Sequence, residues 1–257
     1  MRHPNHLLLG TLVALAACAE PTSRSTPSPA VSRPASAPQA EREAPPSAPP
    51  MRDARGIDVS HHSGTVDWAA VAAGGYAFAF VKATEGIDAL DPTFAGHWRA
   101  LADHGLHRGA YHFYVTEDDP EQQARFFLSQ VDHQPGDLAP VVDVELIGHG
   151  TVGDVAPRLR RFLEIVEQEV GVPPIIYTSP NFWNAHLGTG FERYPLWIAE
   201  YEVEEPTLPE GWGSWTIWQF EGDADVPGVE KGADRSRVHP AADLGSLRVP
   251  PAPAGGA

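Results

Sequence analysis

Residues 139–145 read APVVDVE, an apolar run that ends in two carboxylates two positions apart, Asp143 and Glu145. Two further runs, FAFVKA at 78–83 and PIIYT at 174–178, are also hydrophobic nearly throughout. Such runs are typical of strands buried on both faces, as in a parallel sheet that helices cover. We therefore expect strands at seven places: Gly56–Ser60, Ala77–Ala83, Gly109–Tyr114, Ala139–Glu145, Pro174–Thr178, Leu196–Ala199 and Ser214–Phe220.

The segments between these runs predict helices. Phe94, Trp98 and Leu101 recur at helical spacing, and Pro120 and Pro157 stand where a first helical turn tolerates proline. We expect helices over Asp67–Ala73, Pro92–His104, Pro120–Gln130 and Val155–Val170. Strand and helix would alternate about eight times, which favours a single-domain α/β fold of the (β/α) TIM-like barrel type over a doubly wound sheet.

The first eighteen residues have the composition of an export signal. An apolar run from Leu7 to Ala17 is too short to span a membrane, and it is followed directly by Cys18, the only cysteine in the chain. The ending Leu15-Ala16-Ala17-Cys18 resembles a bacterial lipobox, which predicts cleavage before Cys18, acylation of its thiol and a membrane-anchored lipoprotein, in the outer membrane or periplasm of a Gram-negative cell. An ordinary cleavage site with an incidental cysteine, giving a secreted protein, is the alternative.

The amino-acid composition divides the rest of the chain into a tether, a folded domain and a tail. Residues 19–50 are rich in proline, alanine and serine and contain no aromatic residue, so we expect a disordered tether there. Residues 51–247 form the expected folded domain, and residues 248–257, RVPPAPAGGA, the expected flexible tail.

Charge and residue counts exclude several classes of protein. A net charge of -16 argues against nucleic-acid binding through phosphate contacts. A single cysteine excludes a disulfide framework and a cysteine-based zinc site. His61 and His62 are adjacent, and no H-E-x-x-H spacing or glycine-rich phosphate fingerprint occurs, so we expect neither a metal nor a cofactor.

Polar side chains gather at the carboxyl ends of the expected strands, where a barrel has its active face. Asp143 and Glu145 stand at i and i+2, so they point into the same pocket, and each disfavours ionisation of the other. Glycoside hydrolysis needs a protonated acid beside a charged partner, which this pair could supply. The alternative is that the two carboxylates have a structural role, capping a neighbouring helix or pairing with an arginine. Aromatic residues beside carboxylates suit a sugar cleft, and the candidate substrate-binding residues are Lys82, Glu85, Tyr111, His112, Tyr177, Trp197, Glu200, Trp218 and Gln219.

Eight ordered blocks resemble the glycoside hydrolase family 25 lysozymes (N-acetylmuramidases). They are GIDVSHHSGTVDW, FAFVKATEG, DPTFAGHWRAL, GAYHFY, APVVDVE, IIYT, PLWIAEY and TIWQF, and the likeness covers residues 56 to about 238. The resemblance implies an irregular, flattened barrel with Glu145 as general acid, accompanied by Asp143 and by Asp58 of the opening block. The family's closing G-x-x-G-x-x-D block falls on Gly228–Asp234 and implies a fourth acid, Asp234, although Arg235-Ser236-Arg237 after it departs from the family pattern.

The resemblance implies hydrolysis of the β-1,4 bond between N-acetylmuramic acid and N-acetylglucosamine in peptidoglycan. We expect a monomer that acts on the glycan strands. Two alternatives stay open: a non-catalytic peptidoglycan-binding lipoprotein on the same fold, and a hydrolase of another N-acetylated glycan. Inversion, retention and a substrate-assisted route are all compatible with the residues.

Overall fold

The computed structural model of the 257-residue chain describes residues 51–146 and 155–251. The predicted signal peptide with Cys18, the tether 19–50 and most of the predicted tail lie outside the described residues. None of the described helices has both the length and the apolar character that crossing a membrane requires.

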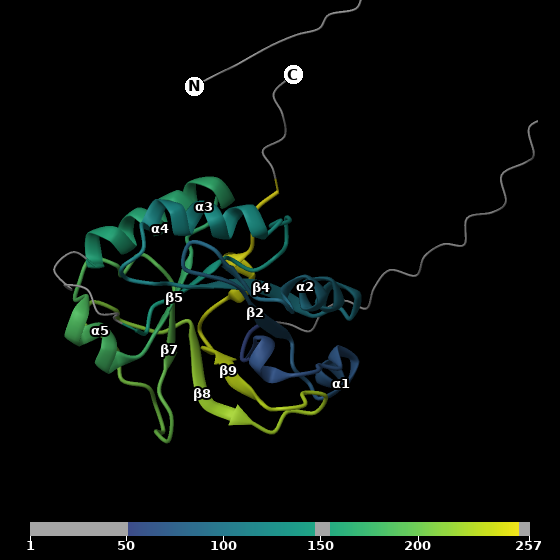
Figure 1. Cartoon of the computed structure of the whole chain (residues 1–257). Helices are drawn as coiled ribbons and strands as arrows, with labels where there is room; N and C mark the ends of the chain where they lie inside the picture. Colours follow the sequence, from purple (N-terminus) through teal and green to yellow (C-terminus); the bar gives the residue numbers. More distant parts are fainter. Residues whose placement is uncertain (1–50, 147–154, 252–257) are drawn as a thin grey trace, which may run out of the picture. The chain divides into compact units, whose positions relative to one another are not determined.

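Eight strands in the described part of the chain form a closed barrel (Figure 1). The order β1-β9-β8-β7-β6-β5-β4-β2 is closed by pairing of β1 with β2. All neighbours are parallel except β9, which runs antiparallel to both β8 and β1. The strands are β1 (Arg55–Val59), β2 (Phe78–Glu85), β4 (His107–Phe113), β5 (Val141–Asp143), β6 (Ile175–Thr178), β7 (Leu196–Ala199), β8 (Ile217–Ala224) and β9 (Ala233–Val238). A short strand, β3 (Ala89–Leu90), forms a hairpin with the end of β2.

Five α-helices are found in the described residues, and Figure 1 shows α3 and α4 packed side by side. The helices are α1 (Trp68–Ala73), α2 (Phe94–Asp103), α3 (Pro120–Gln130), α4 (Val155–Val170) and α5 (Pro180–His186), with 3-10 turns η1 (His61–Ser63) and η3 (Leu244–Leu247).

Local sequence sets the starts of three helices. Asp67, Asp119 and Ser179 each accept hydrogen bonds from backbone N–H groups of the first turn, of α1, α3 and α5 respectively. Proline follows the cap in α3 and α5, where its missing N–H costs nothing.

Alternation along the strands separates two apolar layers. Inward residues such as Phe78, Phe80 and Ile175 fill the barrel interior. Outward residues such as Val81 and Val142 join a second cluster that includes side chains of the surrounding helices. Two inward positions must be glycine, because a Cβ at Gly56 or Gly109 would lie 2.2 Å from the ring of Phe78 or Phe80.

The predicted irregular α/β barrel is confirmed, with all seven expected strands and all four expected helices near their predicted places. The prediction of about eight strand–helix alternations is wrong, because β7 to β9 follow one another without an intervening α-helix. On the other strands, helices cover the outward face, whereas on β8 and β9 arginine side chains cover aromatic rings. The Arg237 guanidinium lies 4.4 Å from the Trp218 ring centroid, and that of Arg235 lies 5.4 Å from the Phe220 ring centroid. Strand β9 was missed because its outward positions carry these arginines instead of apolar residues.

Candidate active site

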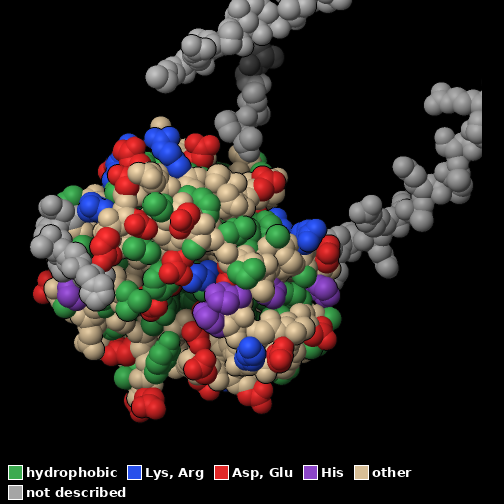
Figure 2. All heavy atoms as spheres, in the orientation of Figure 1, with side chains coloured by type: hydrophobic (Ala, Val, Ile, Leu, Met, Phe, Trp, Pro, Cys, Tyr) green, Lys and Arg blue, Asp and Glu red, His purple; other side chains and the backbone are tan. Residues whose placement is uncertain are grey.

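A cavity of about 250 Å³ opens at the carboxyl ends of the parallel strands. Figure 2 shows a hollow on one face of the barrel where acidic, basic and histidine side chains meet. The lining residues come from most strands of the barrel and from the segments that directly follow them. They are Asp58, Ser60, His62, Lys82, Tyr111, Phe113, Val141, Asp143, Glu145, Tyr177, Trp197 and Asp234.

Strand register explains why these side chains converge. On each strand, the lining residues are the inward ones, two positions apart, as in Tyr111 and Phe113 on β4. The pairing places Asp58 of β1 directly opposite Asp234 of β9, and Asp143 of β5 beside Tyr177 of β6. The first and the last strand of the barrel therefore bring Asp58 and Asp234 together in the barrel mouth.

Four carboxyl groups share this cavity, and their pKa values are all raised. Burial is the largest cause of the raised pKa of Asp143, followed by the charges of Glu145 and Asp58. Burial and then Asp234 raise the pKa of Glu145 and that of Asp58. The pKa of Asp234 is also raised by burial. The cluster therefore holds protons at a higher pH than isolated carboxyl groups would.

Asp143 has a buried oxygen available for a ligand. Its Oδ1 atom has no hydrogen-bond partner among the described residues, although the residue is more than nine-tenths buried. A buried acceptor without a partner costs free energy, so such atoms in a cavity are expected to meet a donor on the ligand.

Gln219 connects the acids to two tyrosines. Its Nε2 donates to Asp58 Oδ2 at 2.9 Å and to Asp234 Oδ2 at 3.4 Å. Its Oε1 accepts from the hydroxyl of Tyr177 at 2.9 Å and from that of Tyr201. Only one orientation of the amide satisfies two hydroxyl donors and two carboxylate acceptors, so Gln219 holds both aspartates in place.

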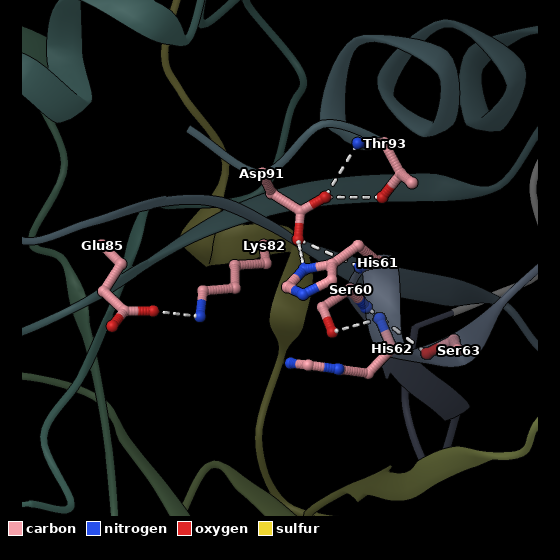
Figure 3. A network of polar contacts seen from close by, with 8 residues as sticks. All are labelled: Ser60, His61, His62, Ser63, Lys82, Glu85, Asp91 and Thr93. Carbon is pink, nitrogen blue, oxygen red and sulfur yellow. Dashed lines mark hydrogen bonds and ion pairs between the residues drawn. The ribbon is translucent and has the colours of Figure 1, made fainter. Parts of the chain in front are cut away.

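Lys82 brings a positive charge to the acidic cavity. The side chain is only 13% exposed, and its Nζ donates to Glu85 Oε2 at 2.6 Å (Figure 3). It also lies 4.8 Å from the ring centroid of Phe113. Its charge partly offsets the rise in the pKa of Asp143 and Glu145 that burial causes.

A buried carboxylate supports the wall of the cavity formed by η1. Asp91 accepts four hydrogen bonds, from the backbone N–H and Nδ1 of His61 and from the backbone N–H and hydroxyl of Thr93 (Figure 3). Burial alone would raise the pKa of Asp91, but these hydrogen bonds lower it below its usual value. The His61 ring in turn packs on His62, with centroids 3.8 Å apart, and His62 lines the cavity.

Two of the predicted substrate-binding residues point away from the cavity. His112 is fully buried, contacts Thr84 and Gln123, and stacks on Phe162 of α4. Burial lowers its pKa to about 4, so it is a neutral packing residue. Trp218 is also outward and donates its indole N–H to the Glu200 carbonyl oxygen. Each is adjacent in sequence to an inward residue and therefore faces outward. The prediction that His112 and Trp218 bind substrate is wrong for this reason.

Glu85 and Glu200 do not line the cavity either. Glu85 pairs with Lys82, and the Glu200 carboxylate accepts hydrogen bonds from Thr207, which orders the segment after β7. Ser60 and His62 line the cavity but are not among the predicted site residues, and Tyr201, which bonds to Gln219, was not predicted either. Ser60 could have been found, because it stands two positions after inward Asp58.

The described residues offer no evident metal site. Within 51–146 and 155–251, no group of three or more histidine, cysteine, aspartate or glutamate side chains could hold a metal ion. Of the four carboxyl groups in the cavity, those of Asp58 and Asp234 are held by Gln219.

The sequence of this chain is similar to those of known proteins. Residues 57–229 match the family model described as glycosyl hydrolases family 25. The chain is 37% identical over 184 residues to the protein named "Uncharacterized protein YegX" of Escherichia coli K12, covering 70% of this chain and 67% of that protein. It is 31% identical over 198 residues to lysozyme M1 of Streptomyces globisporus, covering 72% and 67%.

Solved structures agree with these sequence matches. A bacterial lysozyme from Streptomyces coelicolor superposes with a TM-score of 0.71 at 29% identity, covering 76% of this chain and 96% of that one. A family 25 lysozyme from Aspergillus fumigatus superposes with a TM-score of 0.68 at 28% identity, covering 76% and 98%.

Proposed function

This chain belongs to glycosyl hydrolases family 25, and from that membership and the carboxyl cluster we propose that it is a muramidase. Its substrate is the β-1,4 bond between N-acetylmuramic acid and N-acetylglucosamine in the glycan strands of peptidoglycan. The observation that carries the proposal is the pair Asp143 and Glu145, two residues apart and both lining the cavity with raised pKa values.

Glu145 is the proposed general acid. Its raised pKa keeps a larger fraction of the carboxyl protonated at a given pH than in an exposed glutamate. It stands just beyond the end of β5 and lines the cavity, where it can protonate the glycosidic oxygen as the bond to the anomeric carbon breaks.

Asp143 is proposed to stabilise the sugar as positive charge develops on it, in the ionised form that the nearby charge of Lys82 favours against burial. Its unpartnered Oδ1 can accept a hydrogen bond from the substrate, for example from an acetamido N–H. Asp58 and Asp234, fixed by Gln219, add negative potential on the β1–β9 side of the cavity. Tyr111, Tyr177 and Trp197 supply flat walls for sugar faces.

Analysis of the reducing ends produced tests the activity. Digestion of purified sacculi, borohydride reduction and sugar analysis should give reduced muramic acid as the new terminus. Reduced glucosamine as the main product would contradict the assignment. Binding to sacculi without release of fragments would favour the non-catalytic alternative, and a digest with Glu145→Gln is the matched control.

We also propose that the protein is exported by residues 1–18, anchored through acylated Cys18 and extended from the membrane by residues 19–50. The supporting observations are the lipobox-like ending and a substrate that lies in the cell wall. In this proposal, residues 51–247 form the catalytic domain, and the protein acts as a monomer. Cys18→Ala should move the protein out of the membrane fraction and abolish labelling by a palmitate analogue, while equal partition of both forms would exclude the anchor.

A further inference from the structure

The catalytic cavity continues into a second section of about 220 Å³. Five residues line both sections, namely Asp58, Ser60, His62, Tyr111 and Asp234, so the two form one groove. The second section does not include Asp143 or Glu145. Its additional lining comes from η1 with its flanks and from the β8–β9 hairpin, including Asp223, Lys231 and Gly232.

Lysine is rare in this protein, and its placement is informative. The chain contains two lysines and sixteen arginines, and both lysines line the groove. Lys82 is nearly buried and paired with Glu85. Lys231 is exposed and has no ion-pair partner among the described side chains. Its charge contributes to the lowered pKa of Glu230, although the hydrogen bonds from Thr65 are the larger cause. Lys231 is therefore the cation of the groove that is free to pair with a ligand.

The backbone that carries Lys231 is fixed to the opposite wall. Its N–H donates to the Ser63 carbonyl oxygen at 3.1 Å. Thr65 and Glu230 exchange two more hydrogen bonds, from Thr65 N–H to Glu230 Oε2 at 2.8 Å and from Glu230 N–H to the Thr65 carbonyl oxygen at 3.0 Å. Because the wall is formed before a ligand arrives, binding there costs less ordering of the loop.

The opposite wall carries a second basic side chain. His62 lies where the two sections join, and its position is supported by His61, which Asp91 holds through two hydrogen bonds (Figure 3). Asp58, Asp223 and Asp234 line the same section, so its charge is mixed. Mixed lining disfavours a polyanion such as a phosphate polymer. It suits a sugar unit that has several uncharged hydrogen-bond donors and only one carboxylate. N-acetylmuramic acid is such a unit.

We propose that the second section of the groove binds the lactyl carboxylate of an N-acetylmuramic acid unit through the ammonium group of Lys231. The proposal rests on the muramidase function and adds a basis for preferring muramic acid to glucosamine, which lacks the lactyl group. Glycan strands with peptide-free muramic acid carry this carboxylate, whereas an attached peptide converts it to an amide.

A pair of substrates isolates the carboxylate. Peptide-free glycan strands are compared with the same strands after carbodiimide coupling to ammonia, which turns each lactyl carboxylate into a neutral amide. We expect the wild-type KM to be lower for the acid form by roughly 3- to 30-fold, the range of one charge-assisted hydrogen bond at a partly exposed site, with kcat little changed. Lys231→Gln should lose this preference and Lys231→Arg should keep part of it.

The matched control is Arg99→Gln, which removes an exposed cation from α2, outside the groove lining. It should keep the full preference for the acid form. Equal KM values of the wild type for the two substrates, or a preference that survives in Lys231→Gln, would overturn the subsite.

A binding measurement separates this proposal from the muramidase function. With only two lysines, amine-directed acetylation followed by mass spectrometry reads Lys231 directly, and the same variant without ligand is the reference. In Glu145→Gln, acid-form oligosaccharides should protect Lys231 and amide-form ones should not. Protection without any cleavage by the wild type would refute the muramidase function and keep the subsite, whereas cleavage without protection would refute the subsite alone.

Discussion

The interior of the barrel has two layers made by the same strands. Toward the amino ends of the parallel strands, the inward side chains are apolar and fully buried, and they pack on one another. Toward the carboxyl ends, the inward side chains are mostly charged or polar, and they line the groove or, like Gln219, hydrogen-bond to residues that do. The change from apolar to polar occurs between inward residues two positions apart on four strands: Phe80 to Lys82, Val141 to Asp143, Ile175 to Tyr177 and Ile217 to Gln219.

The two layers contribute oppositely to stability. The apolar layer removes hydrocarbon surface from water and stabilises the fold. The polar layer contains buried carboxyl groups whose raised pKa values mean that the folded state disfavours their ionised forms. Such a conflict with local stability is typical of a catalytic site. Substitutions in the polar layer should therefore lower activity without lowering stability, and those in the apolar layer should lower stability.

The largest effect is expected at Glu145. Glu145→Gln removes the proton donor and should reduce turnover on sacculi by roughly 10²–10⁴-fold, with a melting temperature no lower than that of the wild type and unchanged binding to sacculi. Release of reducing ends and a pelleting assay measure the two quantities. Glu204→Gln, an exposed glutamate in the segment after β7, is the matched control. Activity of Glu145→Gln within a few-fold of the wild type would remove this residue from the mechanism.

The apolar layer should respond in the opposite way. Phe80 is fully buried and packs on Phe78 and Trp197, with ring centroids 5.9 Å and 4.8 Å away. Phe80→Ala should destabilise the protein by about 3–5 kcal/mol, because it leaves a cavity. Chemical denaturation measures this loss, and the activity of the remaining folded protein should stay within a few-fold of the wild type. A large loss of turnover in fully folded Phe80→Ala would contradict the separation of the layers.

The sequence predicted the strands of this barrel better than the facing of its polar residues. The apolar runs located seven strands, because a strand buried on both faces needs hydrophobic residues at successive positions. His112 and Trp218 stand at strand ends, which is why the sequence suggests them for the site, but each lies one position from an inward residue and therefore faces outward. Tyr201 follows its strand in an irregular segment, where no periodicity indicates direction. It reaches the site through its hydrogen bond to Gln219.

The pH dependence of stability should differ between two aspartates. The raised pKa of Asp58, caused first by burial, means that the folded state binds more protons than the unfolded state. Its contribution therefore falls as the pH rises through the range above the unfolded pKa. For Asp91 the lowered pKa has the opposite sign, and its contribution falls as the pH drops below the unfolded pKa.

Denaturation from pH 3 to 8 tests this contrast. Asp58→Asn should be more stable than the wild type at neutral pH, with less loss of stability as the pH rises. Asp91→Asn should be less stable by about 1–3 kcal/mol at neutral pH, because donors on His61 and Thr93 lose a charged acceptor, and the difference should shrink in acid. Parallel pH profiles for both variants and the wild type would contradict the assigned pKa directions.

The smallest effects are expected at the tyrosines that hold Gln219. Both hydroxyls donate to the same Oε1 atom, but Tyr177 is buried whereas Tyr201 is 44% exposed. Tyr177→Phe should lower kcat by roughly tenfold, because water cannot readily replace the buried donor. Tyr201→Phe should lower kcat only about twofold, since solvent can supply the missing hydrogen bond. Equal losses in the two variants would mean that the exposed hydroxyl acts on the substrate and not through Gln219, which would extend the polar layer beyond the barrel interior.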